Sequence, residues 1–110
     1  MKTNWAALRE SLLKRCSGYC EKCGRPLGDD WAAHHRKLKK HGGPDTLPNL
    51  VALHHNCHNL GTTSIHLNPK NSYDTGFLVK SWNDPNNTPI TLHGNKTVLL
   101  TLDGRYEDMP

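Results

Sequence analysis

The sequence predicts a small domain of the α+β class, with one helix first, a strand, strand and helix in the middle, and a β-hairpin near the C-terminus. Apolar residues at helical spacing mark the start of the chain, and short apolar runs bounded by Gly, Pro and Asn follow. Only 35% of the 110 residues are hydrophobic and 6% are aromatic. A core this small gives a marginal fold, so we expect a metal or disulfides to reinforce it.

The first helix is predicted at residues 4–15, where apolar side chains recur at helical spacing and Thr3 or Asn4 can cap the N-terminus. We expect the last eight residues to be frayed. The other predicted elements are strands at 31–38 and 50–53 joined by a loop at 39–49, a helix that starts at His54 and ends near Gly61, a short helix near 72–76, a loop at 83–89, and a hairpin at 90–102 that turns at 93–95.

Two pairs of metal-ligand residues bracket the predicted strands. Cys20 and Cys23 lie in a stretch rich in Gly, Pro and Asp, which favours a tight turn that aims both thiolates at one ion. His54 and Cys57 follow after thirty intervening residues, and their i, i+3 spacing puts both side chains on one helix face. We therefore expect a structural zinc site with three cysteines and one histidine.

Two alternatives for the fourth ligand stay open. His55 or Cys16 could replace His54, although neither has the paired spacing. The chain shows no signal-peptide pattern and no apolar stretch long enough to span a membrane, so we expect a soluble protein in the cytoplasm. A reducing compartment favours metal ligation by the cysteines over disulfides.

The charge is unevenly distributed along the chain. Residues 1–41 hold ten of the fourteen Lys and Arg residues and four of the ten acids, while the rest is slightly acidic. A basic lobe suits a polyanionic partner such as nucleic acid, although a solvated basic face gives the same pattern.

The stretch "HHRKLKKHGGPDTLPNLVALHHNCH" (34–58), together with the upstream "CEKCG", resembles the HNH endonuclease family and its ββα-metal motif. The likeness covers about residues 16–69 and leaves 70–110 as a C-terminal extension of one HNH domain. The family usually has a cysteine where His54 stands here. The resemblance therefore implies a zinc-stabilised ββα-metal fold that hydrolyses DNA phosphodiester bonds.

Site roles follow from the resemblance by position. His35 matches the general base of the family, and His34 matches the preceding ligand of a catalytic divalent ion. Asn49 matches the middle letter of the motif, which orients the base or helps to hold the metal, and His58 matches the final metal ligand. Some members have a further histidine ligand, which His66 could supply here if the short intervening stretch repositions the chain.

The chemistry of the residues agrees with these roles. A neutral imidazole can deprotonate water near neutral pH, and a cation neutralises charge on the phosphate. Imidazole ligands could hold Mg²⁺, Mn²⁺, Ni²⁺ or Zn²⁺ and favour the transition metals. Arg36, Lys37, Lys39 and Lys40 directly follow the candidate base, and we expect them to contact DNA phosphates. We assign no role to the histidines at 41, 55 and 93.

The tail from Ile65 onward ("IHLNPKNSYDTGFLVKSWNDP") is similar to the C-terminal part of small HNH proteins of bacteriophages, which implies a terminase or another DNA-packaging protein as partner. The family implies 5′-phosphate and 3′-hydroxyl products. We expect a monomer or weak dimer. One active site cuts one strand, so a monomer should nick, and a double-strand break would need a dimer or two visits. A non-catalytic zinc module that binds DNA or a packaging protein is the main alternative. An RNA-directed nuclease is the weaker one, because the sequence shows no aromatic platform for RNA.

Overall fold

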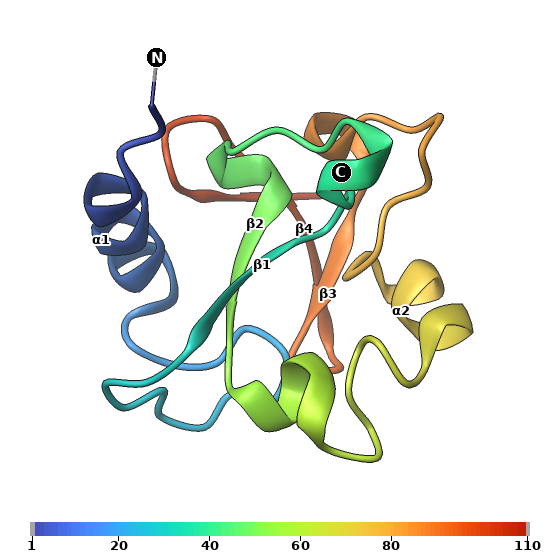
Figure 1. Cartoon of the computed structure of the whole chain (residues 1–110), viewed down its shortest axis with the longest axis horizontal. Helices are drawn as coiled ribbons and strands as arrows, with labels where there is room; N and C mark the ends of the chain where they lie inside the picture. The colour runs from blue at the N-terminus through green and yellow to red at the C-terminus, as the bar shows by residue number, and fades with distance from the viewer. Residues whose placement is uncertain (1, 110) are drawn as a thin grey trace.

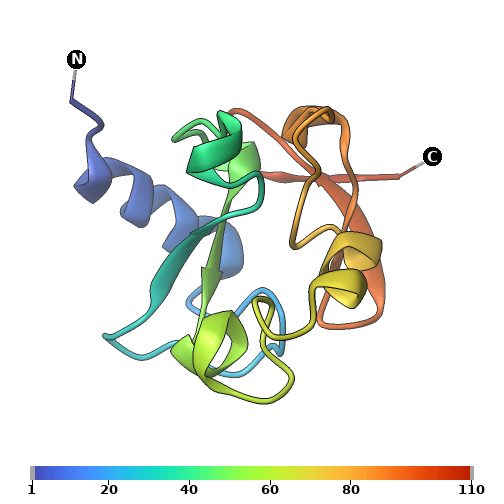
Figure 2. The same cartoon turned by 45° about the vertical axis from the view of Figure 1, so that its right-hand side comes forward.

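The computed structural model describes residues 2–109 and has the expected mixture of helices and short antiparallel strands (Figure 1). The helices α1 and α2 lie on opposite sides of the β1–β2 hairpin in both ribbon views (Figures 1 and 2). The elements are α1 (Trp5–Cys16), β1 (Ala32–His35), the 3₁₀ turns η1 (Lys39–His41) and η2 (Leu47–Asn49), β2 (Leu50–Leu53), the π-helical turn η3 (Asn56–Leu60), α2 (Pro69–Thr75), the 3₁₀ turn η4 (Pro85–Asn87), β3 (Ile90–Leu92), β4 (Lys96–Leu100) and β5 (Tyr106–Asp108).

The helix α1 agrees with its prediction to within one residue at each end. The side chain of Asn4 accepts a hydrogen bond from the Ala7 N–H at 3.1 Å and caps the N-terminus. The C-terminus closes on Ser17 in the left-handed conformation, and the Gly18 N–H donates to the Leu13 carbonyl at 3.1 Å. Leu12 is fully buried and anchors the helix on the core.

The two central strands form the predicted antiparallel hairpin, in which His34 pairs with Val51 and His35 pairs with Leu50. The second strand has its predicted bounds, and all four of its residues are buried. The first strand is shorter than the predicted 31–38. It ends at His35, and the side chain of the next residue, Arg36, is fully buried in the core.

The helix predicted after the second strand is a single π-helical turn, η3. The chain then folds back on that turn, since the Ile65 N–H donates to the Cys57 carbonyl at 2.9 Å and the His66 N–H donates to the His58 carbonyl at 3.2 Å. Within residues 2–109, no helix is both long and apolar enough to cross a membrane.

The C-terminal hairpin forms as predicted from β3 and β4, with His93 and Gly94 at positive φ in the turn. The expectation of a frayed end at residues 103–110 is wrong for the part that the structure describes. β5 pairs with β4, and the Tyr106 hydroxyl donates to Glu21 at 2.6 Å. This contact joins residues far apart in the chain, so local composition could not reveal it. Pro110 lies outside the described residues.

The core is one hydrophobic cluster that joins α1, the central hairpin and the C-terminal sheet, and it also holds a buried ion pair. The Arg15 guanidinium donates to both carboxylate oxygens of Glu21, at 2.8 and 3.0 Å. The same carboxylate accepts from the Ala52 N–H at 2.8 Å. These bonds fix the cysteine turn against the second strand, which is where the candidate metal ligands lie.

Candidate metal centres

The first candidate centre is formed by Cys20, Cys23, His54 and Cys57. One ligand atom from each residue lies within 4.8 Å of the others. A tetrahedral zinc ion with bonds of about 2.0 to 2.3 Å keeps its ligand atoms about 3.3 to 3.8 Å apart. The Cys23 Sγ and the His54 Nδ1 are 3.3 Å apart, so this donor set fits a zinc ion after small movements.

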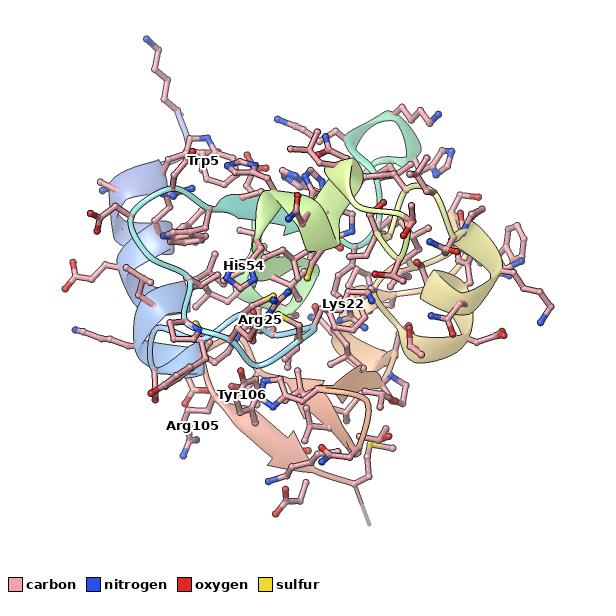
Figure 3. All side chains as sticks on the ribbon, turned by 90° about the horizontal axis from the view of Figure 1, so that it is seen from below. Trp5, Lys22, Arg25, His54, Arg105 and Tyr106 are labelled. Carbon is pink, nitrogen blue, oxygen red and sulfur yellow. The ribbon has the colours of Figure 1, made fainter. Side chains whose placement is uncertain are left out.

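The cysteine turn is built as the sequence indicates. The Cys20 N–H donates to the Arg25 carbonyl at 2.8 Å, and the Gly24 N–H donates to the Cys20 carbonyl at 2.8 Å. Gly24 has a φ of +79°, a conformation that favours glycine. In Figure 3 the labelled Arg25 and His54 lie close together, beside yellow sulfur atoms.

Hydrogen bonding selects His54 among the alternatives for the fourth position. Its Nε2–H donates to the Pro26 carbonyl at 2.6 Å, which leaves the Nδ1 lone pair directed at Cys23. His55 instead pairs with Asp30 at 2.9 Å. The Cys16 thiol points to the Leu13 carbonyl at 3.8 Å. The geometry therefore assembles the predicted Cys3His set.

The thiols of this cluster have unequal acidities. Burial would raise the pKa of the Cys23 thiol, but hydrogen bonds from Arg25, Cys20 and His54 outweigh it and lower that pKa to about 6. Burial and the neighbouring Cys20 and Cys23 raise the pKa of Cys57 to about 12. Without a cation, the thiols cannot all ionise at neutral pH, and a divalent ion would supply the missing positive charge.

The second candidate centre contains only histidines: His34, His58 and His66. Their ligand nitrogens also lie within 4.8 Å of one another, and the ring centroids are 4.7 to 5.2 Å apart. The Nε2 atoms of His58 and His66 are 3.0 Å apart. The fold-back of residues 61–66 thus brings His66 next to His34 and His58, where it can serve as a third ligand.

The hydrogen bonding and the pKa of the His34 ring both suit metal ligation. Its Nε2–H donates to the Phe77 carbonyl at 2.7 Å, so Nδ1 carries the lone pair. Burial lowers the pKa of His34 to about 3 and outweighs that hydrogen bond. Burial also lowers the pKa of His58 to about 4, with a further contribution from His66. The rings of His34 and His58 are therefore neutral at physiological pH, as metal ligation requires.

This donor set fits a divalent transition metal. Its three imidazole nitrogens lie within 4.8 Å of one another, and His66 is exposed to solvent. Such a set leaves coordination positions for water or a phosphate oxygen, which is the arrangement typical of catalytic sites. The Cys3His set supplies all four ligands of a tetrahedral ion, which is typical of structural sites.

The structure places His35 apart from these three rings. The His35 Nε2–H donates to Asp45 at 2.7 Å, and the other Asp45 oxygen accepts from the Thr3 hydroxyl at 2.6 Å. The Trp5 ring packs edge-on against His35 with the centroids 5.8 Å apart. The labelled Trp5 lies at the N-terminal end of α1 in Figure 3. Sequence reasoning missed Asp45, and its only signal was an acid in the loop after the histidine pair.

Asn49 is fully buried and holds the loop that follows the histidine pair. Its side-chain oxygen accepts from the Lys37 N–H at 2.7 Å, and its amide donates to the Lys37 and Pro44 carbonyls at 3.0 Å each. A Cβ at Gly43 would lie 1.7 Å from the Lys37 carbonyl oxygen, which explains the glycine there. Asn49 therefore positions the chain around His35 and contacts backbone groups.

The prediction that Arg36 contacts DNA is wrong for this conformation. Its guanidinium is fully buried and donates to backbone carbonyls, among them Gly76 at 2.7 Å, Pro48 at 2.8 Å and Thr88 at 2.7 Å. Among residues 2–109, no carboxylate pairs with this guanidinium at ion-pair distance. Burial lowers the pKa of Arg36 to about 9.

The three lysines after Arg36 differ in their surroundings. Lys39 and Lys40 are exposed, whereas Lys37 is half-buried. The Lys37 ammonium donates to the Asn83 carbonyl at 3.3 Å, and the Lys39 ammonium lies 3.9 Å from Asp45. Lys39 and Lys40 therefore have room to contact a phosphate. Lys37 can do so only if it gives up its hydrogen bond to the Asn83 carbonyl.

Comparison with known proteins points to one family. A family model described as HNH endonuclease matches residues 20–64, a span that contains every residue of the first centre and two histidines of the second. No curated protein and no solved structure matches the chain significantly.

Proposed function

We propose that this chain, which carries an HNH endonuclease domain over residues 20–64, hydrolyses DNA phosphodiester bonds with a divalent ion held by His34, His58 and His66. The observation that carries the proposal is the separation of two donor sets. One is a complete tetrahedral set, and the other is an imidazole set with open positions. When bound, the divalent ion supplies charge neutralisation on the phosphate and on the leaving oxygen.

His35 is the proposed general base. The Asp45 carboxylate accepts the Nε2–H, so the neutral ring keeps its Nδ1 lone pair for the proton of an attacking water. His35 directly follows the metal ligand His34 on β1, where it pairs with Leu50. Asp45 is the residue that orients it.

Lys39 and Lys40 would contact backbone phosphates, and Lys37 would join them. We place the activity in the cytoplasm of a phage host, with a packaging protein as partner, because the tail resembles that of small phage HNH proteins. A monomer would nick one strand at a time, and a double-strand break would need a dimer or two visits.

A supercoiled-plasmid assay tests the activity. Wild type, His35→Ala and the exposed-surface control His41→Ala are each assayed without added metal and then with Mg²⁺, Mn²⁺, Ni²⁺ or Zn²⁺. We expect metal-dependent nicking by wild type and His41→Ala, and a loss of at least about 100-fold in His35→Ala with unchanged zinc content. An RNA substrate run beside the plasmid separates the RNA-directed alternative.

If the zinc-loaded, folded wild type cuts neither DNA nor RNA with any of the four ions, the chain is a non-catalytic zinc module. Equal nicking by His35→Ala and wild type would keep the nuclease but remove His35 as its base.

A further inference from the structure

Trp82 is the most exposed large apolar side chain in residues 2–109, with 76% of its surface open to solvent. Tryptophan presents a large rigid ring, and leaving one uncovered on a small protein is unfavourable in water. The other two tryptophans pack against the protein, since Trp31 is buried and Trp5 contacts His35. An uncovered ring of this kind is a candidate contact for a partner.

A lysine and a second aromatic ring accompany Trp82. The Lys80 ammonium lies 5.4 Å from the centroid of the Trp82 ring and 4.9 Å from that of the Tyr73 ring. Both are cation–π distances. We call Tyr73, Lys80 and Trp82 the Trp82 surface. It combines a flat apolar ring with a positive charge at its edge.

The chain before and after Trp82 is tied to the end of β1. The Phe77 carbonyl accepts from His34, and the Val79 N–H donates to the Arg36 carbonyl at 2.8 Å. Past the tryptophan, the Asn83 carbonyl accepts from the Lys37 ammonium. Five residues of extended chain span at most about 18 Å. Trp82 therefore lies within about 18 Å of Phe77, whose carbonyl accepts the hydrogen bond from the metal ligand His34. This is about five nucleotides along one DNA strand.

We propose that Trp82 stacks on an unpaired DNA base a few nucleotides from the scissile phosphate, with Lys80 and Lys37 meeting the adjacent phosphates. The proposal rests on the DNA nuclease function and names its substrate class, which is DNA with an unpaired base. Every base offers a π-face to an aromatic ring. In a perfect duplex both faces are covered by neighbouring base pairs, so a free face favours stacking. Flanking lysines favour a nucleic acid over an apolar protein surface.

Fluorescence anisotropy with labelled oligonucleotides tests the proposal. All proteins carry His35→Ala to prevent cutting, and each is compared on a perfect duplex and on the same duplex with one unpaired base. The parent protein, which carries His35→Ala alone, should bind the DNA with the unpaired base more tightly than the perfect duplex. Trp82→Ala should weaken that binding about tenfold or more and the duplex binding much less. Trp82→Phe should retain most of the preference, because it keeps a stacking ring.

Leu102→Ala is the matched control, since Leu102 is 67% exposed and lies in the turn after β4. We expect it to bind both DNAs like the parent protein. Equal binding of the two DNAs by the parent, an unchanged preference in Trp82→Ala, or no binding to either DNA would each overturn the proposal. Because binding is measured without cleavage, these results do not depend on nuclease activity. Wild-type nicking that persists alongside any of them would leave the proposed nuclease standing.

Discussion

The two donor clusters share one short segment but differ in chemistry and exposure. His54 and Cys57 belong to the Cys3His cluster, and the next residue, His58, belongs to the histidine cluster. The first contains two buried cysteines and four ligands, whereas the second ends in the exposed His66. A complete set of four ligands suits a structural ion, and an incomplete set open to solvent suits a substrate. Within the turn η3, Cys57 thus contributes to the proposed structural site and His58 to the proposed catalytic site.

The largest expected effect is on the Cys3His cluster. Cys57→Ser removes one ligand of a small zinc-stabilised fold. We therefore expect the variant to lose its bound zinc, to be unfolded at 37 °C and above, and to show no cooperative unfolding transition on heating. Zinc analysis and circular dichroism measure both. Cys16→Ala should retain one zinc ion and a cooperative transition, because the Cys16 thiol points away from the cluster. Zinc loss in Cys16→Ala, with zinc kept in Cys57→Ser, would reassign the site.

Loss of a histidine ligand should affect activity and leave the fold intact. His66→Ala removes an exposed ring from the open cluster, so we expect nicking to fall at least about 100-fold. The unfolding temperature and zinc content should stay near those of wild type. Plasmid nicking and thermal unfolding are measured on the same preparation. A variant that nicks like wild type would leave only two histidines in the catalytic role.

Asp45 should matter for the rate more than for binding. Asp45→Asn removes the carboxylate that holds the Nε2–H of His35, so we expect kcat to fall about 10- to 100-fold with little change in KM for DNA. Asp29→Asn is the exposed-acid control. If KM rises and kcat is unchanged, Asp45 shapes the DNA-binding loop and does not orient a base.

The smallest expected effect is a pH dependence of stability at His58. The unfolded ring takes up a proton near pH 6.5, whereas burial lowers the pKa of the folded ring to about 4. The stability is therefore fully present above pH 6.5 and is lost as the pH falls toward 4. Full linkage between pH 7 and 5 would amount to about 2 kcal/mol. Because the His58 ring is only half-buried and solvent screens its charge, wild type should lose about 1 kcal/mol, or about 4 °C in Tm, more than His58→Gln.

This comparison is made on zinc-loaded protein without added divalent ions, so that acid effects on the Cys3His cluster are common to both proteins. Differential thermal unfolding at several pH values measures it. Parallel Tm curves for wild type and His58→Gln would show that solvent already reaches the folded ring.

The local parts of the fold were predictable because their determinants lie close together in the chain. The spacing of Cys20 with Cys23 and of His54 with Cys57 is enough to form two ligand pairs, and the structure brings those pairs together. The cap at Asn4, the bounds of β2 and the turn at His93 likewise depend on neighbouring residues. Each is set by backbone geometry over a few residues.

The tertiary structure decided which partners individual side chains contact. Arg36 lies in a run of basic residues, yet it enters the core because carbonyls from distant loops can satisfy its guanidinium there. Asp45 and Tyr106 find their partners in the same way, through contacts with Thr3 and Glu21.

The histidine pair shows the division most clearly. The sequence by itself determined that two adjacent histidines on a strand point in different directions. Only the folded chain decided that His34 meets the Phe77 carbonyl and two further imidazoles, whereas His35 meets Asp45. The reason is physical: residue types and spacing set which atoms are available, and only long-range packing sets which of them meet.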